Sequence, residues 1–254
     1  MSAAKKTAKK TAKAKQTPAR KPAKKAAKRP ARKPAAPVVT TLERLKQAHP
    51  DAHCELDHED EFQLLVATVL SAQSTDVGVN KATPGLFAKW PTAASLAGAE
   101  VSDVERAIAT IGMFRQKAKR IVELSKLLVE RHGGAVPDRL EDLVKLPGVG
   151  RKTANVVLGV WWGRPEGVVV DTHVQRITQR LGWTRNTEPE KIELDLMKQV
   201  PKPEWDSVAH VLIFHGRRVC DAQRPECETC PVHDVCPSAF HAENVGRKPP
   251  RVRA

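Results

Sequence analysis

The sequence predicts an all-α fold. Apolar residues recur at helical spacing along most of the chain after residue 40, and glycines and prolines separate the periodic segments. The only strand-like run, Val168-Val169-Val170, is too short to found a sheet. No apolar run in the sequence is long enough to cross a membrane. We therefore expect helices that bury their apolar faces against one another.

The chain begins with a segment, residues 1–38, that we expect to be a disordered basic tail. Residues 1–36 contain 14 of the 43 lysines and arginines and no Asp or Glu, so they account for the whole formal charge of +14. Such a segment buries too little apolar surface to offset its ordering entropy. The expected role is a nonspecific arm along DNA phosphates, with an affinity that falls steeply as salt rises. A solubilising tail and an organelle-targeting peptide are the alternatives.

Helices are predicted in order along the remainder. Residues 62–70 are apolar on nearly every face, which indicates a helix buried in the middle of a domain. Apolar residues recur at helical spacing from Ala118 to Leu128, and the Gly133-Gly134 pair can stop that helix. Further helices are predicted at residues 103–110, 139–145, 153–161, 172–181, 190–199 and 204–216. Residues 241–254 are expected to form a short basic C-terminal tail.

A glycine-containing turn, residues 146–152, joins two of the predicted helices. Gly148 and Gly150 allow a sharp turn and a close approach of another backbone. The amide groups at the start of the following helix can then meet an anion, and a nucleic-acid phosphate is the natural partner. An ordinary helix–helix turn is the alternative for the two glycines alone.

Lys152 is predicted in the first turn of that following helix. Most lysines are solvated surface groups, but here the positive end of the helix dipole opposes the ammonium form, and partial desolvation would act in the same direction. A neutral amine can form a Schiff base with a sugar carbon, as a lyase requires. Lys152 is therefore a candidate nucleophile.

Asp171 follows the short apolar run and precedes the predicted helix at 172–181. Asp is a favoured helix N-cap, so a purely structural role is one interpretation. A carboxylate that faces a reacting sugar is the other, because it can accept a proton or stabilise positive charge at the anomeric carbon. The two roles are compatible. The neighbouring His173 is expected to be structural.

Four of the five cysteines lie within one short segment: Cys220, Cys227, Cys230 and Cys236. Four thiolates suit zinc or an iron–sulfur cluster, and the presence of only one Cys-x2-Cys arm favours a [4Fe–4S] cluster over zinc. The loop is expected to need its metal to hold its shape. Cys54 is expected to be a packed or idle thiol.

In their order along residues 40–240, these features resemble the endonuclease III family. The segments that carry the resemblance are Leu70-Ser71-Ala72-Gln73-Ser74-Thr75-Asp76, Ile111-Gly112-Met113-Phe114, the hairpin ending in Lys152, Val170-Asp171-Thr172-His173, and the cysteine loop. The resemblance implies the two-domain helix-hairpin-helix DNA glycosylase fold with a [4Fe–4S] cluster loop. One six-helix domain with the hairpin would span residues 55–165, and residues 40–54 with 166–240 would form the cluster domain.

The resemblance also implies a function in base excision repair on double-stranded DNA. A damaged pyrimidine would be flipped into the cleft between the domains. Lys152 would attack C1′ and cut the strand 3′ to the lesion by β-elimination, assisted by Asp171. Gln73 would fill the gap left by the base, and Met113, where relatives commonly have Leu, would wedge into the opposite strand.

The remaining expected DNA contacts lie on the hairpin and on the cysteine loop. On the hairpin these are Gly148, Gly150, Arg151 and Thr153. In the cysteine loop Arg224 is the candidate, although its neighbours Asp221 and Glu226 make the loop less basic than the resemblance would imply. We hypothesise that the N-terminal tail compensates for this.

Two other functions compete with this interpretation. A monofunctional adenine-type glycosylase shares the hairpin, the aspartate and the cluster, but Lys152 argues against it. A non-catalytic nucleoid DNA-binding iron–sulfur protein would show no turnover and little effect of Lys152→Ala. The expected protein is a cytoplasmic, nucleoid-associated monomer without a membrane partner.

Overall fold

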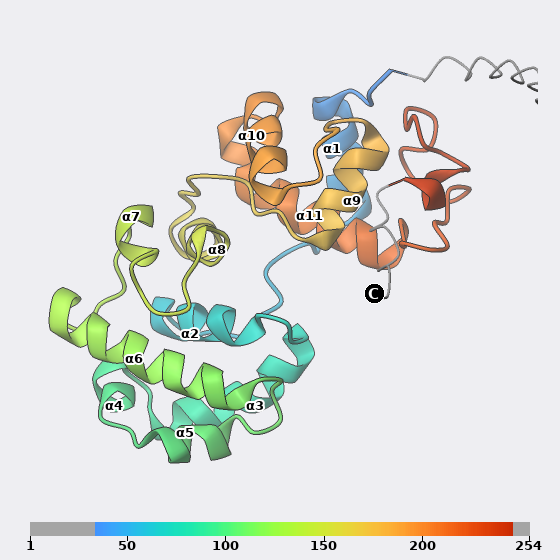
Figure 1. The fold of residues 1–254 in the computed structure, drawn as a ribbon. Coiled ribbons are helices and arrows are strands. Elements are labelled where there is room, and N and C mark those ends of the chain that lie inside the picture. Colours follow the sequence, from blue (N-terminus) through green and yellow to red (C-terminus); the bar gives the residue numbers. More distant parts are fainter. Residues whose placement is uncertain (1–33, 246–254) are drawn as a thin grey trace, which may run out of the picture. The chain divides into compact units, whose positions relative to one another are not determined.

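The computed structural model describes residues 34–245, and every regular element in that range is helical (Figure 1). The all-α prediction is therefore confirmed for the described residues, and the run at 168–170 is not a strand. The helices are α1 (Val38–Ala48), α2 (Glu61–Ser71), α3 (Asp76–Lys89), α4 (Ala93–Ala97), α5 (Val101–Ala107), α6 (Phe114–His132), α7 (Leu140–Leu143), α8 (Arg151–Trp162), α9 (Thr172–Leu181), α10 (Pro189–Gln199) and α11 (Trp205–Arg218), with short 3₁₀ turns η1 (Lys202–Glu204) and η2 (Ala242–Asn244).

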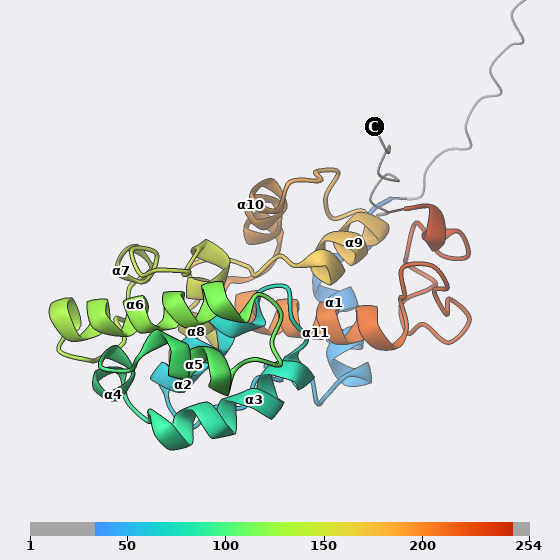
Figure 2. The same cartoon turned by 60° about the horizontal axis from the view of Figure 1, so that its bottom comes forward.

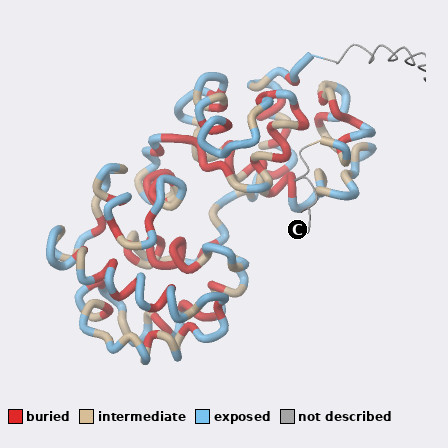
Figure 3. Tube along the Cα trace, viewed as in Figure 1, coloured by how far each residue is buried: buried red, intermediate tan, exposed pale blue. Residues whose placement is uncertain are grey.

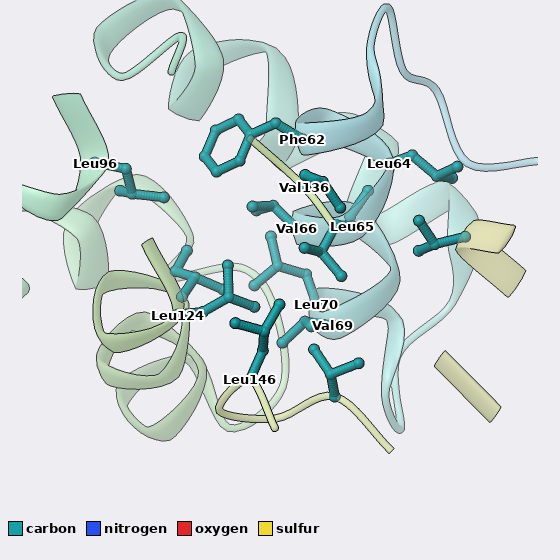
Figure 4. Packing of buried hydrophobic residues seen from close by; sticks show 14 of the residues in the cluster. Phe62, Leu64, Leu65, Val66, Val69, Leu70, Leu96, Leu124, Val136 and Leu146 are labelled. Carbon is teal, nitrogen blue, oxygen red and sulfur yellow. The ribbon is translucent and has the colours of Figure 1, made fainter. Parts of the chain in front are cut away.

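Helix α2 runs through the centre of the first of two hydrophobic clusters, which is formed by residues 56–158. Leu64, Leu65 and Leu70 are fully buried on different sides of it, as its apolar sequence predicts (Figure 4). Helix α2 packs against α8, and α6 packs against α4 and α5 (Figures 1 and 2). The helix that precedes the glycine-containing hairpin and the helix that follows it are thus both anchored in this cluster.

The second hydrophobic cluster joins the start of the described chain, residues 36–45, to residues 168–239. Within it α11 packs against both α9 and α1. Figure 3 shows the buried positions of both clusters along the chain. The two clusters correspond to the two expected domains, although their division into separate domains stays a prediction.

The helix ends follow from local sequence. Asp60 accepts a hydrogen bond from the Gln63 amide and caps α2. Gly133, in the left-handed conformation at φ 61°, ends α6 where the Gly133-Gly134 pair predicted a stop. Helices α1, α3 and α4 were not among the helices predicted one by one; in α3, Gly78, Pro84 and Gly85 dilute the apolar pattern.

The end of the expected N-terminal tail and the start of the expected C-terminal tail contain buried residues. Ala36 is buried, its amide donates to the Leu181 carbonyl at 2.9 Å, and its carbonyl accepts from the Trp183 indole at 2.8 Å. At the other end Ala242 is buried, and the Val245 carbonyl accepts from Arg180 at 3.1 Å. The remainder of the two tails lies outside the described residues. Among the described helices, none has the length and apolarity that crossing a membrane requires.

Candidate active site

The hairpin between α7 and α8 is anchored by two buried apolar residues, Leu146 and Val149. Between them Gly148 has a φ of +81°, and a Cβ at this position would lie 3.2 Å from Val69 Cγ1 and 3.3 Å from Arg120 Cδ. The positive φ favours glycine at this position, and the neighbouring atoms are side-chain atoms and not another backbone. A Cβ on Gly150 would meet no described atom within 4 Å, and the φ of Gly150 is negative, so the close approach expected of both glycines is limited to side chains at Gly148.

Gly150 is the N-cap residue of α8 and has extended backbone angles. Within the described residues no side chain caps this helix, so the amides of its first turn are available to a ligand. Lys152 and Thr153 lie in this turn. The start of α8 therefore has the geometry expected of an anion-binding hairpin.

Lys152 and Asp171 line one cavity of about 340 Å³. Its walls come from the end of α2, the start of α8, the segment before α9, and α11, so both hydrophobic clusters contribute to it. Gln73 and Thr153 line it as well. Lys152 is exposed, so the protein alone does not provide the partial desolvation that was considered for it.

Asp171 is the N-cap of α9. Its Oδ1 accepts hydrogen bonds from the amides of His173 and Val174, each at 2.8 Å. Its other carboxylate oxygen, Oδ2, makes no hydrogen bond to the described residues, so it can serve the cavity. The structural and the chemical roles considered for Asp171 are thus compatible in the structure. His173 contacts Arg176 at 3.2 Å, and burial lowers its pKa.

Two residues of this cavity, Asp76 and Arg217, were not predicted as site residues. Arg217 Nη2 donates to Asp76 Oδ2 at 2.8 Å, and Arg217 also pairs with Glu55. Burial raises the pKa of Asp76; the positive charge of Lys152 opposes this shift, and the negative charge of Asp171 adds to it. Asp76 stands in a motif already noted, but an Asp in the first turn of a helix is common, and the sequence gives no indication of its partner on α11.

Gln73 and Met113 are exposed residues in the left-handed conformation, at φ 56° and 57°. This conformation is strained for residues other than glycine and is found preferentially at functional positions. Their loops touch, since a Cβ on Gly112 would lie 3.8 Å from the Gln73 carbonyl oxygen. Lys117, which is 2% exposed, donates from Nζ to Ser74 Oγ at 2.8 Å and ties the two loops together.

Arg151, an expected phosphate contact, is paired with a carboxylate of the protein. Its Nε lies 3.0 and 3.1 Å from the two carboxylate oxygens of Glu193 on α10. The Glu193 side chain is only 11% exposed. The guanidinium is therefore already held by a carboxylate in the protein.

The four cysteines of the 220–236 segment line one common cavity with apolar walls. Arg180, which is fully buried, donates to Cys220 Sγ at 3.2 Å and to the carbonyls of Asp221 and Ala222. Burial raises the pKa of the Cys230 thiol to about 11. Among the described residues, no three His, Cys, Asp or Glu side chains are close enough to share a single metal ion.

Two remaining predicted positions lie on or near these sites. Arg224 follows the Asp221 turn, where its amide donates to Asp221 Oδ1 at 3.0 Å. Cys54 is a half-buried thiol that lines the cavity of Lys152, and burial raises its pKa. Cys54 is thus packed beside the candidate active site.

Comparisons with known proteins identify the family of this chain. Residues 66–202, more than half of the chain, match the model of the HhH-GPD superfamily of base excision DNA repair proteins. Endonuclease III of Synechocystis is 50% identical over 195 residues, which are 77% of this chain and 89% of the relative. Endonuclease III of Escherichia coli K12 is 42% identical over 77% of this chain and 92% of the relative.

A solved structure of a trapped covalent intermediate between endonuclease III and DNA is 43% identical. It superposes with a TM-score of 0.75 and covers 81% of this chain and 95% of that one. The chain belongs to the HhH-GPD superfamily of base excision DNA repair proteins and, within it, to the endonuclease III family of DNA glycosylases and abasic-site lyases.

Proposed function

We propose that this enzyme removes oxidised pyrimidines from double-stranded DNA and cleaves the resulting abasic site, with Lys152 as nucleophile and Asp171 as its carboxylate partner. The observation that carries the proposal is the cavity of about 340 Å³ that both residues line. This volume is in the range of small-molecule sites, about 300 to 1,000 Å³, and it suits an extruded base.

The reaction uses groups that line this cavity. Lys152 Nζ attacks C1′ and forms a C–N bond while the glycosidic bond breaks. The electron pair of the glycosidic bond leaves with the base, which takes up a proton. Asp171 assists this attack and stabilises the positive charge that develops on the sugar. Ring opening gives a Schiff base, loss of a 2′ proton follows, and the C3′–O bond breaks with its electron pair on the 3′ phosphate.

The DNA contacts follow from the loops around the cavity. The backbone at Gly148, Gly150 and Thr153 binds a phosphate at the start of α8. Gln73 fills the gap in the duplex and Met113 enters the opposite strand; the left-handed backbone that both share supports these roles. Arg224 adds a phosphate contact, and the enzyme acts as a monomer on nucleoid DNA.

The four cysteines that line the second cavity fit a [4Fe–4S] cluster better than zinc. Four cysteine thiolates suit either group, and the single Cys-x2-Cys arm, Cys227 and Cys230, favours the iron–sulfur cluster. All four cysteines line one common cavity, so they can act together as ligands of one cluster. The cluster would hold the shape of the 220–236 segment, and no step of the reaction passes through it.

Borohydride trapping tests the proposed chemistry. Wild-type enzyme is mixed with duplexes that carry an abasic site, an oxidised pyrimidine or no lesion, and borohydride reduces any Schiff base to a stable adduct. We expect a covalent adduct on both lesions with wild type and none with Lys152→Ala. Lys145→Ala, an exposed lysine just before the hairpin, is the matched control and should trap like wild type.

The outcomes separate the competing functions. A wild-type adduct that persists in Lys152→Ala would assign the nucleophile to another amine. Release of free base without an adduct would indicate a monofunctional glycosylase. If wild-type enzyme released no base and formed no adduct on any lesion, the protein would be a DNA-binding protein without catalytic activity.

A further inference from the structure

Arg151 and Glu193 form an ion pair between the two hydrophobic clusters. Arg151 is the first residue of α8, and Glu193 lies in the middle of α10. Arg151 Nη2 is 2.9 Å from Glu193 Oε1, in addition to the two contacts of Nε. A guanidinium bonded through two nitrogens has a fixed direction, unlike a lysine at the same place.

The same pair holds the segment that leads to Asp171. Arg151 Nη2 also donates to the Glu166 carbonyl at 3.3 Å, and the Glu166 amide donates to Asn155 Oδ1 at 3.0 Å. Gly167 packs directly on the Glu193 carboxylate, since a Cβ at residue 167 would overlap Glu193 Oε1. Residues 166 and 167, which lie five and four residues before Asp171, are therefore held by three contacts.

We propose that Arg151 is a positioning residue: paired with Glu193, it fixes the start of α8, which carries Lys152, against the segment that carries Asp171. The alternative is the phosphate contact expected from the sequence, in which Arg151 leaves Glu193 on DNA binding. This inference rests on the proposed function of Lys152 and Asp171.

The test uses single-turnover rates of base release and strand cleavage, because such rate constants do not change when only the folded fraction falls. Arg151→Lys keeps the charge but loses the bidentate geometry, and Glu193→Gln keeps the shape but loses the charge. Gly167→Ala displaces the Glu193 carboxylate and also crowds Asn155 Nδ2, so it perturbs two of the contacts on residues 166 and 167. Asp138→Asn is the matched control, because it breaks the exposed Arg164–Asp138 pair, which has the same 2.9 Å distance.

We expect Arg151→Lys, Glu193→Gln and Gly167→Ala each to lower the single-turnover rate by about 10- to 100-fold, since small misplacements of reacting groups have effects of this size. Asp138→Asn should react like wild type. The Arg151→Lys, Glu193→Gln double variant should be little slower than either single variant, because both remove the same interaction.

DNA affinity as a function of salt distinguishes the alternative. If Arg151 contacts a phosphate, Arg151→Met should make the negative slope of log K against log salt less steep by about 0.9. In that case Arg151→Lys should retain activity, and Glu193→Gln should bind DNA at least as tightly as wild type. That combination would overturn the proposal. Variants with wild-type rates beside an active wild type would refute this inference alone, whereas a wild type without base release or adduct would remove the proposed function and this inference together.

Discussion

Asp171 combines two demands in one carboxylate. Oδ1 accepts the two first-turn amides of α9, and Oδ2 has no bond to the described part of the chain. The cap fixes the side chain on its backbone, so the free oxygen is presented to the cavity without loss of rotamer freedom during the reaction. Because Asp171 stabilises the helix by capping it and acts in the reaction by its charge, different substitutions can separate the two roles.

We predict that Asp171→Asn and Asp171→Ala differ in stability and agree in activity. Asn caps a helix about as well as Asp, whereas Ala loses about 1 kcal/mol of the free energy of unfolding. Both remove the negative charge, so single-turnover cleavage should fall by about 10² to 10⁴-fold. Thermal unfolding and cleavage rates measure the two effects. Near-wild-type cleavage by Asp171→Asn would assign Asp171 a capping role alone.

The sequence indicated some residues of the site and not others. The local sequence suggests a role for Lys152 and Asp171, the family resemblance implies one for Gln73, and all three line one cavity. The partners of Arg151 and Lys117 lie 42 and 43 residues away in the sequence, so no local pattern reveals them. Arg151 was expected to contact DNA, because only the folded chain brings Glu193 to it.

Helix α6 begins with a buried cation. Met113 caps the helix in a left-handed conformation, and one turn later Lys117 is 2% exposed, with Ser74 Oγ as the one hydrogen-bond partner of its ammonium group among the described residues. Burial lowers the pKa of Lys117 below the usual 10.5. A buried charge with so little compensation is unfavourable for stability and is retained most readily where it orders a functional loop.

We predict that Lys117→Met stabilises the protein and slows base excision. Loss of the buried charge should raise the free energy of unfolding by about 1 kcal/mol, while loss of the tie to Ser74 should reduce the cleavage rate by about 10-fold. Because the folded-state pKa is lowered, wild-type stability should increase as pH rises through that pKa toward 10.5, and the difference from Lys117→Met should shrink. Chemical denaturation at several pH values measures it.

The matched control lies on the same helix. Lys119 is exposed and pairs weakly with Glu123, so Lys119→Met should change neither the pH dependence nor the rate. If Lys117→Met lowered stability at neutral pH and left cleavage unchanged, Lys117 would be an ordinary packing residue.

Whole helices were predictable where their apolar pattern is dense. The predicted ranges for α2, α8, α9, α10 and α11 agree with the structure to within about two residues, the usual uncertainty at frayed ends. Helix α3 depends on packing of Val79, Ala82 and Leu86 against the first hydrophobic cluster, which overrides the weak propensity of Gly78, Pro84 and Gly85. Only the tertiary structure supplies that stabilisation.

The described chain as a whole depends on the cysteine segment to complete the second hydrophobic cluster, since Cys220, Cys230, Val232 and Cys236 all pack against it. We predict about four irons and four acid-labile sulfides per chain in purified enzyme. Loss of the iron, or Cys230→Ser, should lower the melting temperature, because binding of a structural metal contributes directly to folding. One zinc per chain without iron would contradict the cluster assignment.

The second hydrophobic cluster joins residues 36–45 to residues 168–239, while the first uses only residues 56–158 in between. During translation all residues of the first cluster are synthesised before residues 168–239, against which residues 36–45 pack in the second cluster. Folding of a nascent chain generally proceeds from its N-terminal units. We therefore expect a translation intermediate in which the hairpin and Lys152 are in place before Asp171 has been folded against them. The enzyme becomes competent only after residues 168–239 have packed against residues 36–45.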